Sequence, residues 1–316
     1  MRKDRALDEH LEQKGVSRRD FMKFCTMVSA SMGLAPAFGP KIAEALVSAQ
    51  RPPVVWLSMA ECTGCAEATL RTMYPWIDTL VLDILSLDYH ETIMAPSGEA
   101  SEKSLHDSVT KNAGKFICVV DGAIPTAENG IYGMIGGRTM LEIAKEVCPK
   151  ALANICIGTC SSFGGVQAAA PNPTGAKDLE SALGEALKTP VVKIPGCPPN
   201  PVSFVGTIVN YLLFGKLPDL DSKKRPLFAY GQTIHDTCPR RSHYEAGEFV
   251  TAFGSKEEQA GYCLFQLGCK GPETYNNCSR VKFNDGTSWP VQAGHPCIGC
   301  SEPDFWDKMS PFYKSL

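Results

Sequence analysis

Apolar and polar positions alternate in blocks between residues 53 and 214. Short runs rich in β-branched residues predict buried strands, and stretches with apolar residues every three or four positions predict helices between them. The predicted strands are 54–58, 80–85, 116–120, 153–157 and 191–194. The predicted helices are 66–73, 138–147, 179–187 and 202–214. Such alternation is typical of an α/β fold with a doubly wound parallel sheet and helices on both faces.

The pattern changes after the charged cluster at 223–225. Residues 226–316 contain six cysteines and many glycines and prolines, but almost no periodic apolar positions. A segment with so few core-forming runs needs another source of order, and bound metal would supply it. We therefore expect two domains, at 46–225 and 226–316, after a leader at 1–45.

The leader has the order of an export signal. Arg18-Arg19 within Ser-Arg-Arg-Asp-Phe is a twin-arginine motif, and a weakly apolar stretch at 24–38 follows it. The small-residue site ending at Ala45 predicts cleavage there, with Ala49 as a second candidate. The alternative is an amphipathic helix with a chance arginine pair. If the segment is an export signal, the mature protein is periplasmic.

Charge and composition narrow the classes of function. The 316-residue chain has a formal net charge of −3, which gives no sign of a nucleic-acid partner. No stretch after the leader approaches the roughly 18 apolar residues that span a bilayer, so we expect no transmembrane anchor. The 14 cysteines would form disulfides or bind metal. Because the twin-arginine route carries folded proteins with cofactors inserted, metal is favoured.

Four cysteines directly follow predicted strands: Cys62, Cys65, Cys160 and Cys197. The carboxyl ends of parallel strands meet at one edge of a sheet, so we expect these thiols to converge there. Four thiolates suit a 4Fe–4S cluster, and the helix capped by Asn200 would direct its positive end towards such an anion. The alternatives are a zinc ion held by four thiolates or four unrelated buried cysteines.

The C-terminal part offers a second set of ligands. His235 precedes Cys238 by three positions, and Cys263 and Cys269 come later. One imidazole and three thiolates would ligate an iron–sulfur cluster or a zinc ion, and the spacing alone does not choose between them.

A third group consists of Cys278, Cys297 and Cys300. Three cysteines are one short for a four-iron cube or a structural zinc ion, and they are the right number for a 3Fe–4S cluster. The remaining cysteines lie in the leader or beside apolar strand and helix patterns, where we expect buried thiols that behave as small hydrophobic residues. They are Cys25, Cys118, Cys148 and Cys156.

Taken together and in order, these motifs resemble the small subunit of nickel–iron hydrogenases, over nearly the whole chain. The motifs are the twin arginines, Glu61-Cys62-Thr63-Gly64-Cys65, Gly158-Thr159-Cys160, Pro195-Gly196-Cys197-Pro198-Pro199, His235-x-x-Cys238, Gly268-Cys269-Lys270-Gly271-Pro272 and Pro296-Cys297-Ile298-Gly299-Cys300. The resemblance implies a flavodoxin-like domain followed by a small irregular iron–sulfur cluster-binding domain.

The resemblance also implies two 4Fe–4S clusters and one 3Fe–4S cluster. The proximal 4Fe–4S cluster would use Cys62, Cys65, Cys160 and Cys197; the medial 3Fe–4S cluster Cys278, Cys297 and Cys300; the distal 4Fe–4S cluster His235, Cys238, Cys263 and Cys269. The nickel–iron centre lies on a separate large subunit, so no catalytic residue is expected here, with Glu61 as a candidate proton relay. The expected electron acceptor or donor is a periplasmic c-type cytochrome.

Four alternatives differ from this family in features that can be checked. A hydrogen-sensing relative shares the clusters but lacks an export signal. A related quinone-oxidoreductase subunit has adjacent cysteines in its first motif, where Thr63 and Gly64 stand between them here. Relatives containing selenium have a fourth medial cysteine at the place of Pro290. A zinc-binding structural protein of another class would be colourless, whereas iron–sulfur clusters are brown.

Overall fold

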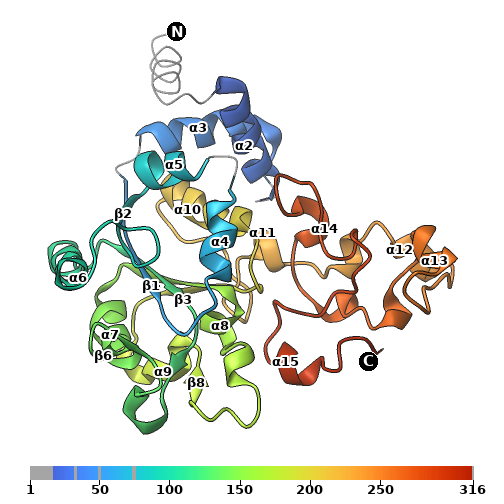
Figure 1. The fold of residues 1–316 in the computed structure, drawn as a ribbon. Helices are drawn as coiled ribbons and strands as arrows, with labels where there is room; N and C mark the ends of the chain where they lie inside the picture. The colour runs from blue at the N-terminus through green and yellow to red at the C-terminus, as the bar shows by residue number, and fades with distance from the viewer. Residues whose placement is uncertain (1–16, 32–33, 49–50, 73–75, 315–316) are drawn as a thin grey trace.

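The computed structural model describes residues 17–31, 34–48, 51–72 and 76–314. At its centre lies a five-stranded parallel sheet in the order β2-β1-β3-β7-β9 (Figure 1). These strands are β1 (Pro53–Ser58), β2 (Ser86–His90), β3 (Ile117–Asp121), β7 (Ala153–Ile157) and β9 (Val191–Ile194). Two small antiparallel ribbons pair β4 (Ile124–Pro125) with β8 (Ala176–Lys177) and β5 (Met134–Ile135) with β6 (Arg138–Thr139). The predicted doubly wound α/β fold is confirmed.

Helices cover both faces of the sheet. One face packs against α2 (Arg18–Ser31), α3 (Gly39–Ser48), α4 (Gly64–Leu70) and α10 (Pro201–Phe214). The other packs against α6 (Glu99–Lys111), α7 (Met140–Val147) and α9 (Leu179–Leu183). The single-turn elements of this part are α5 (Ile77–Thr79), α8 (Gly158–Phe163), η1 (Pro36–Phe38), η2 (Leu80–Ile84), η3 (Ala127–Gly130), η4 (Cys148–Lys150), η5 (Val166–Ala168) and η6 (Gly184–Ala186).

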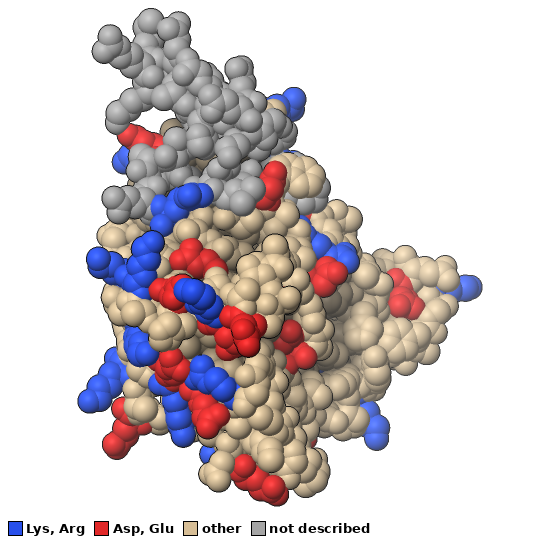
Figure 2. Space-filling model, turned by 60° about the vertical axis from the view of Figure 1, so that its left-hand side comes forward, with Lys and Arg blue, Asp and Glu red and all other residues tan. Residues whose placement is uncertain are grey.

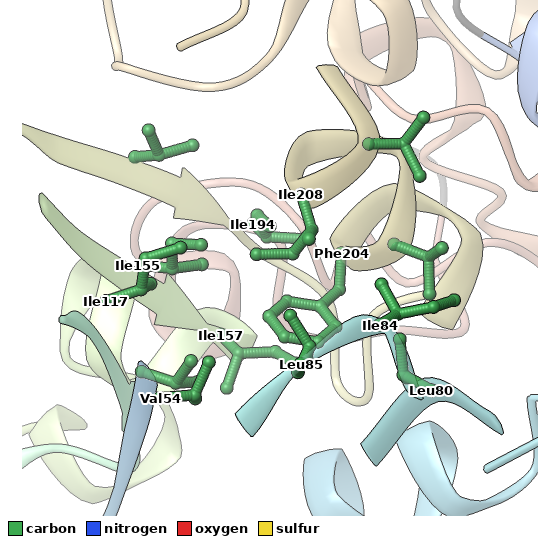
Figure 3. Close-up of a cluster of buried hydrophobic side chains, with 14 of the residues drawn as sticks. Val54, Leu80, Ile84, Leu85, Ile117, Ile155, Ile157, Ile194, Phe204 and Ile208 are labelled. Carbon is green, nitrogen blue, oxygen red and sulfur yellow. The ribbon is translucent and has the colours of Figure 1, made fainter. Parts of the chain in front are cut away.

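The strands bury both of their faces because their apolar runs are continuous. Val54 and Trp56 face the α10 side, whereas Val55 and Leu57 face the α7 side. Figure 3 shows the first of these cores, in which Phe204 of α10 lies against strand residues. This two-sided burial is the usual state of a parallel sheet and fixes which loops emerge at its carboxyl edge.

One predicted strand was wrong. Residues 80–84 form the π-helical η2, which follows α5, and the strand begins only at Ser86, after Leu85. Ile77, Leu80, Val81, Ile84 and Leu85 have the i, i+3, i+4, i+7, i+8 spacing of a helix face, and Leu82 is a further apolar residue outside that pattern. The local richness in Leu and Val hid that period.

Other elements differ less from their predictions. The predicted helix at 66–73 runs as Gly64–Leu70, and the one at 179–187 ends at Leu183 before a 3-10 turn. Asn200 caps α10 as expected, since its side chain accepts a hydrogen bond from the Val202 N–H. The amphipathic helix α6 was not predicted.

The leader segment forms helices that pack on the body of the chain. Phe21 and Cys25 of α2, with Ile42 and Ala43 of α3, are buried in the same core as α10. The predicted cleavage site at Ala45 falls within α3, and the second candidate, Ala49, lies outside the described residues. The domain limits at 45 and 225 stay predictions.

The C-terminal part consists of loops and single helical turns (Figure 1). Its elements are α11 (Leu227–Tyr230), α12 (Arg241–Glu245), α13 (Lys256–Gln259), α14 (Cys278–Val281), α15 (Phe305–Lys308), η7 (His235–Thr237), η8 (Phe265–Leu267) and η9 (Gly271–Glu273). Two small apolar clusters are centred in it, and each includes predicted ligand cysteines; the second also includes Phe163, Ala168 and Ala169 of the preceding part. None of the helices that the structure describes has the length and apolarity to cross a bilayer.

Charged side chains of both signs are interspersed on the face shown in Figure 2. Neither Lys and Arg nor Asp and Glu form a large field of one sign on this face. The pattern agrees with the small net charge of −3.

Candidate iron–sulfur sites

The four proximal candidates lie at the carboxyl edge of the sheet. Cys62 follows β1, Cys65 is in the first turn of α4, Cys160 is in α8 directly after β7, and Cys197 follows β9. Their thiols lie close enough to affect one another. Burial raises the pKa of Cys65 well above its usual range, and Asp121, Cys160 and Cys197 raise it further. The structure therefore brings the four residues together, as the strand-end argument predicted.

Glycines let the backbone approach these sulfur atoms closely. A Cβ added to Gly158 would lie 2.4 Å from the Cys65 Sγ, and one added to Gly165 would lie 2.5 Å from the Cys160 Sγ. Both glycines have positive φ, 86° and 70°, a region that side chains disfavour. The four thiols converge, and the glycines leave space around them that Cβ atoms would fill. This arrangement suits a 4Fe–4S cluster.

Two carboxyl groups border this group of thiols. Asp121, at the end of β3, is fully buried, and neither carboxyl oxygen has a hydrogen-bond partner of normal geometry. Burial raises its pKa to about 7, although the neighbouring Cys65 thiol acts in the opposite direction. Glu61 is partly buried, and burial raises its pKa as well. Sequence reasoning singled out Glu61 but missed Asp121, because a carboxylate ending a strand gives no distinctive pattern.

The medial candidates line a cavity of about 650 Å³. Cys278 starts α14, and Cys297 and Cys300 lie on the loop before α15. Burial raises the pKa of Cys278 well above its usual range, and the nearby Cys300 and Cys297 raise it further. Pro290 lines the same cavity. Cys197 of the proximal group lines the same cavity. The three medial candidates are the right number of thiols for a 3Fe–4S cluster.

The distal candidates line one small cavity: His235, Cys238, Cys263 and Cys269. The His235 ring lies edge-on to Tyr244, with ring centroids 4.6 Å apart. Burial, with a smaller effect of Arg241, lowers the pKa of His235, so its imidazole is favoured in the neutral form that binds iron. His235 is partly exposed, which places this group near the surface.

Each group of thiols touches the next. Burial raises the pKa of Cys300 to about 11, while a hydrogen bond from the Cys197 backbone lowers it. The N–H of Cys297 donates to the Cys269 Sγ at 3.4 Å. The three groups therefore form a row, in which Cys197 meets Cys300 and Cys297 meets Cys269.

The other cysteines lie apart from these groups. Cys25, Cys118, Cys148 and Cys156 are fully buried, and the Sγ atoms of Cys118 and Cys148 are 3.9 Å apart. Burial raises the pKa of Cys156 well above its usual range. Among the described residues, no three His, Cys, Asp or Glu side chains are placed to hold a single metal ion.

Comparisons with known proteins decide the family. Residues 230–313 match the C-terminal family of the NiFe/NiFeSe hydrogenase small subunit, and residues 62–211 match the NADH ubiquinone oxidoreductase, 20 Kd subunit family. The chain is 57% identical to the periplasmic [NiFe] hydrogenase small subunit 1 of Nitratidesulfovibrio vulgaris, over 98% of this chain and 96% of the relative. The chain belongs to the [NiFe] hydrogenase small subunits.

Further relatives and solved structures agree with this assignment. The quinone-reactive Ni/Fe-hydrogenase small chain of Wolinella succinogenes is 50% identical over 96% of this chain and 85% of that relative. The reduced, active Ni-Fe-Se hydrogenase of Desulfomicrobium baculatum superposes with a TM-score of 0.80 at 38% identity, over 84% of this chain and all of that chain. The resemblance stated from the motifs is thereby confirmed.

Membership has direct consequences. A hydrogenase small subunit pairs with a large subunit that contains the catalytic centre, so this chain is part of a heterodimeric oxidoreductase. The family implies iron–sulfur clusters on this chain and nickel–iron on its partner. The cysteine groups described above are the candidates for holding them.

Proposed function

We propose that this small subunit transfers electrons between the large subunit and an external partner through three clusters in a row. The proximal 4Fe–4S cluster is held by Cys62, Cys65, Cys160 and Cys197, the medial 3Fe–4S cluster by Cys278, Cys297 and Cys300, and the distal 4Fe–4S cluster by His235, Cys238, Cys263 and Cys269. The single observation that supports this most is the continuity of the row, with Cys197 against Cys300 and Cys297 against Cys269.

When bound, the clusters would supply one-electron carriers whose potentials depend on their ligands and exposure. The residues of the chain fix where those carriers lie. Gly158 and Gly165 let the backbone come close to the proximal thiols, and Cys278 is buried at the medial site. The neutral, partly exposed His235 suits an exit to a partner.

Glu61 is the candidate proton relay of this chain. It directly precedes the proximal ligand Cys62, and its Oε2 is buried without a hydrogen-bond partner. A buried carboxyl oxygen without a hydrogen-bond partner is costly. A donor from the large subunit, or a water molecule, would therefore supply the missing hydrogen bond to Glu61 Oε2. A proton could then be held at Oε2.

The remaining parts of the proposal concern location and partner. The leader at 1–45 directs the folded protein to the periplasm by the twin-arginine route, and a c-type cytochrome exchanges electrons with the distal cluster in either direction. Support comes from Arg18-Arg19 and from the relative in Nitratidesulfovibrio vulgaris, whose name includes the word periplasmic.

The test is anaerobic purification of the native heterodimer with metal analysis and electron paramagnetic resonance (EPR). We expect brown protein with nickel, iron for two 4Fe–4S clusters and one 3Fe–4S cluster, and an oxidised 3Fe–4S signal. The small subunit separated from its partner should not reduce dyes with hydrogen. Colourless protein that contains zinc, or hydrogen-dependent dye reduction by the nickel-free chain, would contradict the proposal.

A further inference from the structure

Thr159 lies between two candidate proximal ligand loops and one medial ligand. It is in the first turn of α8, next to Cys160, and is 1% exposed. Its Oγ1 accepts a hydrogen bond from the Gly196 N–H at 2.9 Å, and its own N–H donates to the Gly196 carbonyl at 3.0 Å. The same hydroxyl donates to the carbonyl of Cys300. One side chain is thus bonded to the backbone beside Cys197 and to the backbone of Cys300.

This arrangement differs from that of three other buried hydroxyls in the described helices. Thr69, Ser161 and Thr207 each donate to the carbonyl four residues earlier, which satisfies the hydroxyl within its own helix. The Thr159 hydroxyl instead joins residues 37 and 141 positions away along the chain. It therefore fixes a distance between loops rather than a helical turn.

Removing the hydroxyl would leave two backbone groups without partners. Gly196 is buried, and among the described residues no other side chain donates to the Cys300 carbonyl. Unpaired buried groups are costly, so the two loops would shift until water or new partners satisfied them. Such a shift moves Cys197 and Cys300, which line the same cavity.

We infer that Thr159 is a positioning residue that sets the separation of the proximal and medial clusters and thus their electronic coupling. The inference rests on the proposed cluster assignment. Electron transfer between fixed carriers falls steeply with distance, so a small shift of the two loops would slow the transfer without removing any ligand. No proton, ligand or redox group of Thr159 takes part in the reaction.

The test compares T159V with T159S in the complete heterodimer. Valine keeps the shape and removes the hydroxyl, whereas serine keeps the hydroxyl. T207V is the matched control, because Thr207 is as deeply buried at 1% and its hydroxyl bonds only within α10. Three quantities are measured: iron content, the magnetic interaction between proximal and medial clusters in EPR, and the rate at which the medial cluster is reduced by hydrogen after rapid freezing.

We expect T159V to retain its iron, to show a changed magnetic interaction, and to reduce the medial cluster severalfold more slowly. T159S and T207V should resemble the wild type in both respects. A T159V enzyme with full iron and wild-type interaction and rate would overturn the inference. If T159V loses iron, T159A replaces it in the comparison with T159S, and wild-type behaviour of T159A, or a changed interaction in T159S, overturns the inference.

A failure of the cluster assignment would look different. The wild-type heterodimer would then lack the 3Fe–4S signal or the expected iron, whatever residue stands at position 159. The wild-type measurement therefore separates an error in the proposed clusters from an error about Thr159.

Discussion

At the level of single residues, contacts with sulfur explain why glycine stands at particular positions. Gly158 has φ of 86°, and a Cβ there would lie 2.4 Å from the Cys65 Sγ. Gly184 has a similar positive φ of 54°, but a Cβ there would meet nothing within 4 Å. An alanine at Gly184 would therefore cause backbone strain alone, whereas an alanine at Gly158 would cause backbone strain and also crowd the Cys65 thiol.

We predict that G158A prevents assembly of the proximal cluster, whereas G184A keeps it. Both variants should lose roughly 1 kcal/mol or more in folding free energy, because alanine at positive φ is strained. Only G158A displaces a thiol. Iron content and the EPR spectrum of the reduced heterodimer measure the difference. Equal iron in the two variants would mean that Cys65 is not a ligand in this geometry.

Pro290 offers a second prediction for a single residue. It lines the cavity that Cys278, Cys297 and Cys300 surround, so a cysteine there would add a fourth thiol. We expect P290C to convert the medial cluster from 3Fe–4S to 4Fe–4S and to lower its potential, because another thiolate adds negative charge near iron. The oxidised 3Fe–4S signal should disappear. P290S, which adds no thiol, should keep the signal, and its persistence in P290C would contradict the assignment.

At the level of elements, the N-terminal helices carry the proposed export signal and pack on the body of the chain. α2 begins at Arg18 and is preceded by the exposed Ser17, and Arg19 is exposed. Farther along the same helix, Phe21 and Cys25 are buried against the body of the chain. Ser17 and Arg19 of the motif are therefore accessible, while Phe21 of the motif and Cys25 are covered.

Replacing Arg18 and Arg19 together by Lys should leave both subunits in the cytoplasm. The change keeps the charge but alters the motif that the export machinery reads, and the large subunit would travel only as part of a folded complex. Cell fractionation with antibodies to each subunit measures this. K41R, a conservative change in α3, is the control and should be exported normally. Large subunit in the periplasm of the double variant would refute shared export.

At the level of the whole molecule, buried ion pairs join the sheet-containing part to the cluster-bearing loops. Arg225 Nη1 lies 2.7 Å from Glu302 Oε1, and both residues are nearly inaccessible, at 2% and 3% exposed. Glu302 also accepts from the Tyr275 N–H and pairs with Lys223. Glu302 is two residues from Cys300, so this network holds the medial loop in place.

We predict that E302Q destabilises the heterodimer by about 2–3 kcal/mol. Removing one member of a buried pair costs ~3–5 kcal/mol when the other charge is left alone, but here Asp221 still pairs with Arg225. The exposed pair Lys103–Asp107 is the control, and K103A should cost less than about 0.5 kcal/mol. Denaturant unfolding of the two variants measures the difference. Equal midpoints would show that the network adds no net stability.

The sequence by itself predicted the three groups of cysteines. Strand-end positions indicated the four proximal candidates, the short spacings of His235 to Cys238 and of Cys297 to Cys300 indicated the other two groups, and the family resemblance implied the complete ligand sets. It also determined four of the five sheet strands, since continuous β-branched runs are typical of a sheet buried on both faces. It failed at 80–85, where apolar residues are so dense that strand and helix periods overlap.

Only the tertiary structure decided how the groups meet. Cys197 and Cys300 are far apart in the chain, and so are Cys269 and Cys297, so their contacts follow from how irregular loops pack on the sheet. The buried Asp121 carboxyl without a hydrogen-bond partner, and the Thr159 hydroxyl that bonds to a distant loop, likewise follow from tertiary packing. Secondary-structure periods record which face of an element is buried, but they carry no information on which distant loop lies against it.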